Sequence, residues 1–247
     1  MNSLQRLLCV VSVAALVAFA WRYADESVPG FESVRLSYRP SDVVILDRNE
    51  LPLDTIRSEK SYRSLDWVTL AEVSPLFLKT LVRAEDKRFF GHTGVDAVAI
   101  LSAIRDSIET GRIRGASTLT MQLVKELAAR GVVASQAVGK TVLGKFVQGA
   151  LAIVLEMNWS KTQILEAYVN LASYRGELKG LRAAAYSQFD RTPLALGKVE
   201  SAILVAQLRS PNIGTEKLKE RVRFLLRHEE GVNDLEKSVE DSVHRPV

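Results

Sequence analysis

The apolar residues of this chain recur every three or four positions from Ser74 onward, and this repeat constrains the fold more than any other feature. The period is that of an amphipathic α-helix, which buries one face against a core. Ser74 and Pro75 suit the N-cap and the first position of the first helix. The successive apolar stripes are Leu78, Leu81 and Val82; Val98, Leu101, Ile104 and Ile108; Leu119, Leu123, Val124 and Leu127; Val142, Phe146, Ala150, Ile153 and Val154; Ile164, Leu165, Tyr168 and Val169; and Ile203 to Leu208. Because no long alternating stretch follows residue 60, we predict a mostly α body.

A short β region is predicted before the helices. The run Val43-Val44-Ile45-Leu46 is typical of a strand, and Leu51 to Ile56 follows a polar turn as a possible return strand. Asp25 to Pro40 contains two prolines and a glycine, and we expect a linker there. Residues 216–247 mix both charges with few apolar residues, which predicts a solvated helix that frays into a tail.

The composition excludes several classes of protein. The chain has 247 residues, of which 47% are hydrophobic and 25% charged, and these values exclude a largely disordered chain and suit one domain with attachments. A single cysteine excludes an intramolecular disulfide, and with only three histidines little material remains for a metal cluster. The net charge of +4 permits nucleic acid, anionic lipid or phosphate as partners and selects none of them.

The N-terminus carries a separate apolar stretch. No residue from Leu7 to Trp21 is charged, and with Leu4 included the run is about 18 residues, interrupted by Gln5 and Arg6, which is a short but adequate span for a bilayer core. Arg6 and Arg22 flank it, which predicts a single-pass signal-anchor over residues 1–24. The alternative is a cleaved signal peptide, because Ala18-Phe19-Ala20 has the form of a cleavage site. Either interpretation exports the rest of the chain.

An acidic pair, Glu85 and Asp86, ends the first helical run and precedes a basic, aromatic and glycine-bounded turn. Adjacent residues on a helix point about 100° apart, so the two carboxylates cannot share one proton as a dyad does. One of them could face a cleft and act as a general base or acid. The alternative is an ordinary solvated charge run.

Hydroxyl groups gather before another helix, at Ser117, Thr118 and Thr120. Hydroxyls and free amides at a helix N-terminus suit an anionic oxygen, and Lys125 lies about two turns further along. The alternative is that Ser117 is a plain N-cap. Lys145, on an otherwise apolar helix, is either a second phosphate-binding cation or a snorkelling surface lysine.

Taken in order, these clusters resemble the glycosyltransferase 51 family of peptidoglycan polymerases over about residues 40–215. The family motif E-D-x-x-F-x-x-H-x-G is matched at Glu85, Asp86, Phe89, His92 and Gly94. The motif G-x-S-T-x-T-x-Q-x-x-K is matched at Gly115, Ser117, Thr118, Thr120, Gln122 and Lys125. The motif S-K-x-x-I-L-E-x-Y-x-N is matched at Ser160, Lys161, Ile164, Leu165, Glu166, Tyr168 and Asn170.

The chain departs from the family pattern at three places. Met121 stands where the family usually has Gln, and Gly144-Lys145-Phe146-Val147-Gln148 replaces an Arg-Lys-x-x-Glu motif. Gln188-Phe189-Asp190-Arg191 replaces Tyr-Phe-Gly-Lys. The first two changes are similar to the penicillin-binding protein 1C branch, which keeps the glutamate at the position of Glu85.

The resemblance implies a lysozyme-like helical fold and polymerisation of lipid II, with undecaprenyl pyrophosphate as the leaving group. Glu85 would be the catalytic base, and Lys125 and Lys145 would bind the pyrophosphate. Donor contacts are expected at Ser117, Thr118 and Gln122. Asp86, Phe89 and His92 would support the site, whereas Lys161, Glu166 and Asn170 would be structural. The resemblance implies no protein-held metal and no required cofactor, although Mg²⁺ or Mn²⁺ could assist at the pyrophosphate.

The expected organisation is an anchor (1–24), a linker with a short β region (25–72), the catalytic domain (73–215) and a charged tail (216–247). A transpeptidase domain needs some hundreds of further residues and does not fit into this chain of 247, so we expect a polymerase without that domain at the outer face of the bacterial inner membrane. Its expected partners are lipid II, the nascent glycan strand and the membrane, with other cell-wall synthases possible and nucleic acid excluded. Two alternatives stay open: a non-catalytic homologue that binds lipid II or a synthase, and a glycan-cleaving enzyme.

Overall fold

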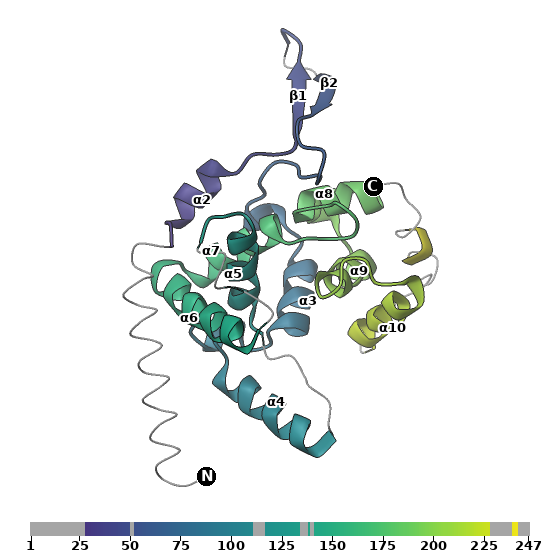
Figure 1. Cartoon of the computed structure of the whole chain (residues 1–247). Coiled ribbons are helices and arrows are strands. Elements are labelled where there is room, and N and C mark those ends of the chain that lie inside the picture. Colours follow the sequence, from purple (N-terminus) through teal and green to yellow (C-terminus); the bar gives the residue numbers. More distant parts are fainter. Residues whose placement is uncertain are drawn as a thin grey trace. The chain divides into compact units, whose positions relative to one another are not determined.

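The computed structural model describes residues 28–49, 52–110, 117–133, 138, 141–227 and 239–241. The chain divides into two compact units, and each is described by itself. The first contains the start of the chain up to Leu36 and then Arg88–Ile164, and the second contains Ser37–Lys87 and the residues from Leu165 onward. Helices dominate both units (Figure 1), so the predicted mostly α body is confirmed.

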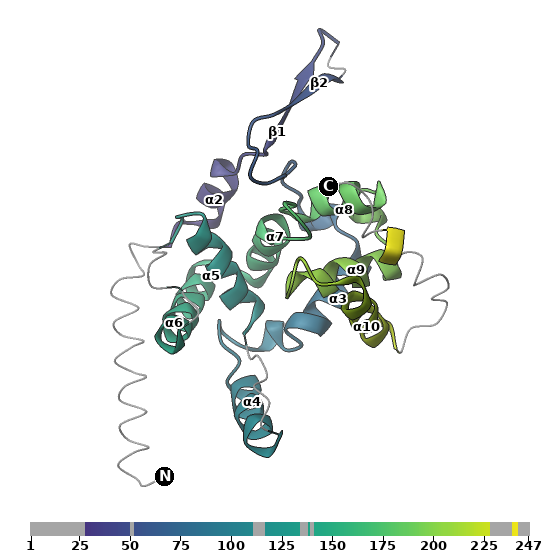
Figure 2. The same ribbon diagram turned by 45° about the vertical axis from the view of Figure 1, so that its right-hand side comes forward.

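The first unit packs helices α5 (Leu119–Ala129) and α6 (Val142–Asn158) against each other, as both views show (Figures 1 and 2). The apolar stripe of α5 is buried, as its period predicts. The unit also contains the short η2 (Phe89–Gly91) and helix α4 (Ala97–Thr110). Helix α7 (Lys161–Leu171) begins in this unit and continues in the second.

Part of the predicted linker is a helix, α2 (Phe31–Ser37). Phe31 and Val34 are buried, and the ring of Phe31 meets Trp159 edge to face with 5.3 Å between the ring centroids. Trp159 also donates its indole N–H to the carbonyl of Pro29 at 3.0 Å. The linker expected over residues 25–40 thus contains a helix, which buries two apolar residues one turn apart and packs Phe31 against a distant tryptophan.

Gly94 allows the backbone of the first unit to pass close against α6. Its φ is +73°, and a Cβ atom built on it would lie 2.5 Å from the backbone nitrogen of Ile153. Only glycine avoids both the left-handed strain and the collision. The carbonyl of Gly94 accepts a hydrogen bond from the Thr118 hydroxyl at 2.6 Å, which places the start of α5 beside this turn.

The second unit starts with the predicted hairpin. Strands β1 (Asp42–Leu46) and β2 (Pro52–Arg57) pair antiparallel, with Asp42 opposite Arg57 and a register irregularity after Ile45. Arg63 reaches Asp42 at 3.1 Å, and Arg57 pairs with Glu177 at 2.7 Å. The second ion pair connects the base of the hairpin to a distant part of the same unit.

Helices make up the rest of the second unit. They are η1 (Leu70–Glu72), α3 (Pro75–Glu85), the remainder of α7, α8 (Leu181–Phe189), η3 (Pro193–Ala195), α9 (Lys198–Leu208) and α10 (Thr215–Leu226). Helix α9 is almost fully buried and contacts both α3 and α10 (Figure 2). Helix α3 begins at Pro75 after Ser74, as predicted, although the Ser74 hydroxyl donates to the carbonyl of Leu196 at 2.7 Å and makes no cap bond.

Helix α10 lies in the region expected to be solvated. Its residues Leu218, Val222 and Leu226 are buried, and they share one core cluster with Ala202, Ile203 and Val239. A single apolar face is enough to pack a highly charged helix against a core. The prediction of a solvated helix gave the many charges more weight than this apolar face. Helix α8 was also missed, because its alanines carry too weak an apolar signal.

Two residues expected to be structural tie segments of the second unit together. The amide of Asn170 accepts from the N–H of Val68 at 2.8 Å and donates to the carbonyl of Val68 at 2.7 Å. Glu166 accepts from the indole of Trp67 at 3.0 Å. Both contacts agree with the structural roles predicted for the motif that contains them.

Among the helices of the described residues, none is long and apolar enough to cross a bilayer. The anchor predicted over residues 1–24 lies outside the described residues, as does most of the tail beyond residue 227.

Candidate active site

In the first unit the side chain of Lys145 lies at the start of α5. Its ammonium group donates to the hydroxyl of Ser117 at 3.2 Å and to Oε1 of Gln148 at 3.0 Å. Gln148 in turn donates its Nε2 hydrogen to the backbone carbonyl of Met121 at 2.6 Å. Thr141 caps α6 by accepting from the N–H of Gly144, which begins the helix one turn before these contacts. The hydroxyl segment and the apolar lysine helix, separate in the sequence, therefore meet at one point.

Burial lowers the pKa of Lys145 below its ordinary value, and the positive charge of Lys125 lowers it further. The two predicted pyrophosphate-binding lysines are thus close enough to repel each other. A bound anion would lessen that repulsion by favouring the charged form of both lysines.

Thr118, and not Ser117, caps helix α5. Its hydroxyl accepts from the N–H of Met121 at 3.1 Å and donates to the carbonyl of Gly94, and the residue is buried. The alternative of Ser117 as a plain N-cap is therefore wrong, and its hydroxyl contacts Lys145 instead. The contacts of Thr118 position the helix, while Gln122 lies half-buried in the first turn of α5.

In the second unit Glu85 is the last residue of α3, and Arg209 binds it from the C-terminal end of α9. The Arg209 Nε atom lies 2.8 Å from Oε1 of Glu85, and its Nη2 donates to the carbonyl of Ala84 at 3.0 Å. The side chain of Glu85 is only 3% exposed, whereas that of Arg209 is 59% exposed. A nearly buried carboxylate is therefore paired with a cation that reaches it from the solvent side.

Sequence reasoning missed Arg209. It follows an apolar helix as one arginine among many, and the two partners are 124 residues apart. To predict the pair, one would have to know that the Glu85 carboxylate is buried and that the helix ending at Arg209 packs beside it.

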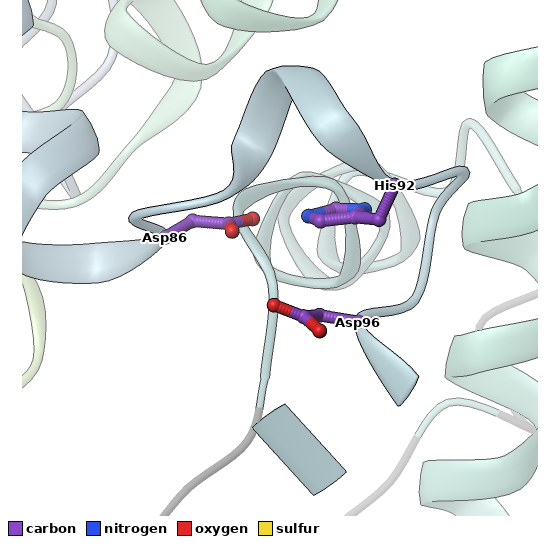
Figure 3. Close-up of side chains that lie close together, drawn as sticks. All are labelled: Asp86, His92 and Asp96. Atoms are coloured by element: carbon purple, nitrogen blue, oxygen red, sulfur yellow. The ribbon is translucent and has the colours of Figure 1, made fainter. Parts of the chain in front are cut away.

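Asp86, His92 and Asp96 direct their side chains toward one another (Figure 3). One potential ligand atom from each lies within 4.8 Å of the others, a donor set that suits a divalent cation. However, Arg88 already contacts Asp96 with both Nε and Nη2, at 2.9 and 2.6 Å, and Asp96 also accepts from the N–H of Ala99. Although burial raises the pKa of Asp96, these bonds and the Arg88 charge outweigh it and lower the pKa. The carboxylate of Asp96 is thus already occupied by the ion pair with Arg88 and by the hydrogen bond from the first turn of α4.

Phe89, predicted as a supporting residue, is fully buried beneath a polar network of the first unit. The ammonium of Lys161 lies 4.4 Å from the centroid of its ring and pairs with Glu156 at 2.7 Å. Glu156 also accepts from the hydroxyl of Thr120. Because the Glu156 side chain is 4% exposed, this buried network connects α5, α6 and α7 and gives Lys161 the structural role predicted for it.

The predicted site residues thus form two groups. Ser117, Thr118, Gln122, Lys125 and Lys145 belong to the first unit, and Glu85 belongs to the second. The first group offers positive charge and hydroxyls to an anion. The second offers one carboxylate for proton transfer.

The sequence is similar to a known family and to several named proteins. A family model described as Transglycosylase matches residues 50–230.

Several similar proteins carry the name biosynthetic peptidoglycan transglycosylase. The one from Mannheimia succiniciproducens is 34% identical over 148 residues, which cover 60% of this chain and 58% of that protein. One from Haemophilus influenzae is 36% identical over 149 residues, covering 60% and 59%. One from Pectobacterium carotovorum is 33% identical over 174 residues, covering 70% and 68%. The chain spans less than two thirds of the length of the first two of these relatives.

Proposed function

This chain belongs to the transglycosylase family, and on that premise we propose that it polymerises lipid II into glycan strands, releasing undecaprenyl pyrophosphate, on a lysozyme-like fold. The observation that carries the proposal is the Lys145 ammonium, which lies 3.2 Å from the Ser117 hydroxyl just before the start of α5 and feels the charge of Lys125. Two cations, a hydroxyl and a helix N-terminus together suit a pyrophosphate.

Glu85 acts as the general base. Its carboxylate removes the proton from the 4-hydroxyl of the acceptor sugar, and that oxygen forms a bond to the anomeric carbon of the donor. The bond from the anomeric carbon to the pyrophosphate oxygen breaks, and the configuration at that carbon is inverted. A nearly buried carboxylate suits this role because little water competes for the proton.

The lysines stabilise the leaving group. Negative charge grows on the pyrophosphate oxygens as the glycosidic bond breaks, and we propose that the positive charges of Lys125 and Lys145, which act on each other, stabilise it together. Fixed charges directed at developing charge are usually the largest single contribution to such a reaction. Ser117 holds the Lys145 ammonium in place, and Gln122 is proposed to contact the donor.

The site is proposed to work at the outer face of the bacterial inner membrane. The donor carries a lipid tail, so the enzyme must meet it at a membrane surface, and the apolar stretch over residues 1–24 would keep the chain there. We further propose lipid II, the nascent strand and other cell-wall synthases as partners. Mg²⁺ or Mn²⁺ would act by accompanying the pyrophosphate.

The test is polymer formation by the purified full chain in detergent with fluorescent lipid II, separated by gel electrophoresis. We expect glycan polymers from the native chain, and a loss of about a thousandfold in kcat for Glu85→Gln. The matched control is Glu220→Gln, an exposed glutamate on α10, which should polymerise normally. Equal activity of Glu85→Gln and the native chain would contradict the role of Glu85. Binding of lipid II without any turnover, or release of soluble fragments from purified cell wall alone, would overturn the proposed reaction.

A further inference from the structure

We infer that Gln148 is a positioning residue for Lys145, and that it must be an amide because it joins an ammonium group to a backbone carbonyl. The inference rests on the proposed function, since the purpose of the arrangement is to present Lys145 to a pyrophosphate. It concerns one of the positions where this chain departs from the Arg-Lys-x-x-Glu pattern of the family it resembles.

The contacts of Gln148 connect two helices. The residue is 2% exposed and lies three positions after Lys145, on the same face of α6. Its Oε1 accepts from the Lys145 ammonium at 3.0 Å, and its Nε2 donates to the carbonyl of Met121 on α5 at 2.6 Å. The bridge therefore fixes the Lys145 ammonium relative to α5, where it also reaches the Ser117 hydroxyl.

Only a group with one donor end and one acceptor end can make both bonds. An ammonium group has donors alone, and a backbone carbonyl has acceptors alone, so the bridging side chain must accept from one and donate to the other. The amide of Gln148 does this in a single orientation. A glutamate carboxylate at this position would direct an oxygen at the carbonyl oxygen of Met121. Both atoms are acceptors, so no hydrogen bond forms, and because the site is buried, the loss of that bond lowers stability.

The neutral amide of Gln148 also leaves the positive charge of Lys145 unneutralised. A carboxylate 3 Å from Lys145 would form an ion pair and cancel much of the positive charge offered to the donor, whereas the neutral amide holds the ammonium and leaves its charge in place. The direction of the Lys145 pKa agrees with this, because burial and Lys125 lower it. The amide therefore leaves the positive charge of Lys145 to act together with that of Lys125.

The experiment compares Gln148→Glu and Gln148→Met with the native full chain. Inorganic pyrophosphate serves as the probe in calorimetric titrations, with Lys145→Met as the reference for binding lost at this site. The second readout is the NMR titration of the Lys145 ammonium, and the third is KM and kcat for lipid II. Gln188→Met is the matched control, because Gln188 is an equally buried amide that bridges to Gln207 in the second unit.

We expect pyrophosphate affinity to fall about tenfold in Gln148→Met and at least as much in Gln148→Glu. Gln148→Glu should raise the pKa of Lys145, because a carboxylate beside it favours its charged form. Gln188→Met should cost similar stability and leave pyrophosphate affinity and the Lys145 titration unchanged.

Three outcomes would overturn the inference: native affinity in Gln148→Glu, an unchanged Lys145 titration in that variant, or equal losses of affinity in Gln148→Met and Gln188→Met. The first two readouts do not require turnover. If the native chain binds pyrophosphate through Lys145 and forms no polymer, the proposed reaction fails while the role of Gln148 stands.

Discussion

Arg209 holds the carboxylate of Glu85 through Nε at 2.8 Å, and the same guanidinium group donates to the carbonyl of Ala84, the residue before it. The arginine therefore binds both the side chain and the backbone at the end of α3. The carboxylate proposed to take a proton in the reaction is thus oriented by a residue from the end of another helix, α9.

Replacing Arg209 should lower kcat more than it changes KM. Arg209→Met removes the cation and leaves the nearly buried Glu85 carboxylate without this partner, so we expect kcat to fall about tenfold and stability to fall by about 1–3 kcal/mol. Arg209→Lys should restore only part of the activity, because a lysine cannot make both contacts of the guanidinium fork. Steady-state kinetics with lipid II and urea denaturation measure the two effects. A native kcat in Arg209→Met would show that the ion pair plays no part in turnover.

Pyrophosphate binding should weaken at alkaline pH. Lys145 binds an anion only while it is protonated, and its pKa is lowered by burial and by Lys125. Affinity should therefore fall as the pH rises through this lowered pKa. Lys125→Met removes the repulsion, so the pKa of Lys145 rises and the loss of affinity moves to higher pH, although affinity at neutral pH is weaker. Calorimetric titrations with pyrophosphate across the alkaline range test this shift, with Lys217→Met at an exposed lysine as the control. If the pH at which half of the affinity is lost is the same in Lys125→Met and the native chain, the prediction is refuted.

Asp96→Asn should destabilise the chain at neutral pH and matter less in acid. The amide can still accept from the N–H of Ala99 but loses the ion pair with Arg88, at a cost of about 1–3 kcal/mol. Because the folded pKa of Asp96 is lowered, its contribution to stability is present above the unfolded pKa and is lost as the pH falls through the folded one. Urea denaturation from neutral to acidic pH should show the two proteins converging. A constant difference would contradict the assignment to this ionisation.

Gly94→Ala should be strongly destabilising. The added methyl group meets the backbone of α6 at 2.5 Å, and the backbone conformation with φ of +73° strains any residue other than glycine. Together, the collision and the backbone strain should lower the free energy of unfolding by about 3 kcal/mol. Gly131→Ala is the matched control, because its φ of +70° is nearly the same while nothing lies within 4 Å of the added atom. Thermal denaturation should show a larger loss for Gly94→Ala; equal losses would mean that strain alone, and not the close approach, requires the glycine.

Much of the fold could be predicted because helices and hairpins are local. The apolar period located α3, α5 and α6, and the strand and turn residues located the hairpin. Prediction failed where the local signal was weak, as in alanine-rich α8, or where a distant partner supplied the burial, as for Phe31 against Trp159.

The sequence by itself determined which residues can do chemistry here: a glutamate at the end of a helix, hydroxyls before another and lysines one or two turns along. These follow from spacing and capping, which depend on neighbours in the chain. Only the tertiary structure decided which of them touch. Arg209 meets Glu85 across 124 residues, and Gln148 of one helix joins Lys145 to the Met121 carbonyl of another. Such partners depend on how helices pack, and packing is set by the sum of many weak apolar contacts that no short motif encodes.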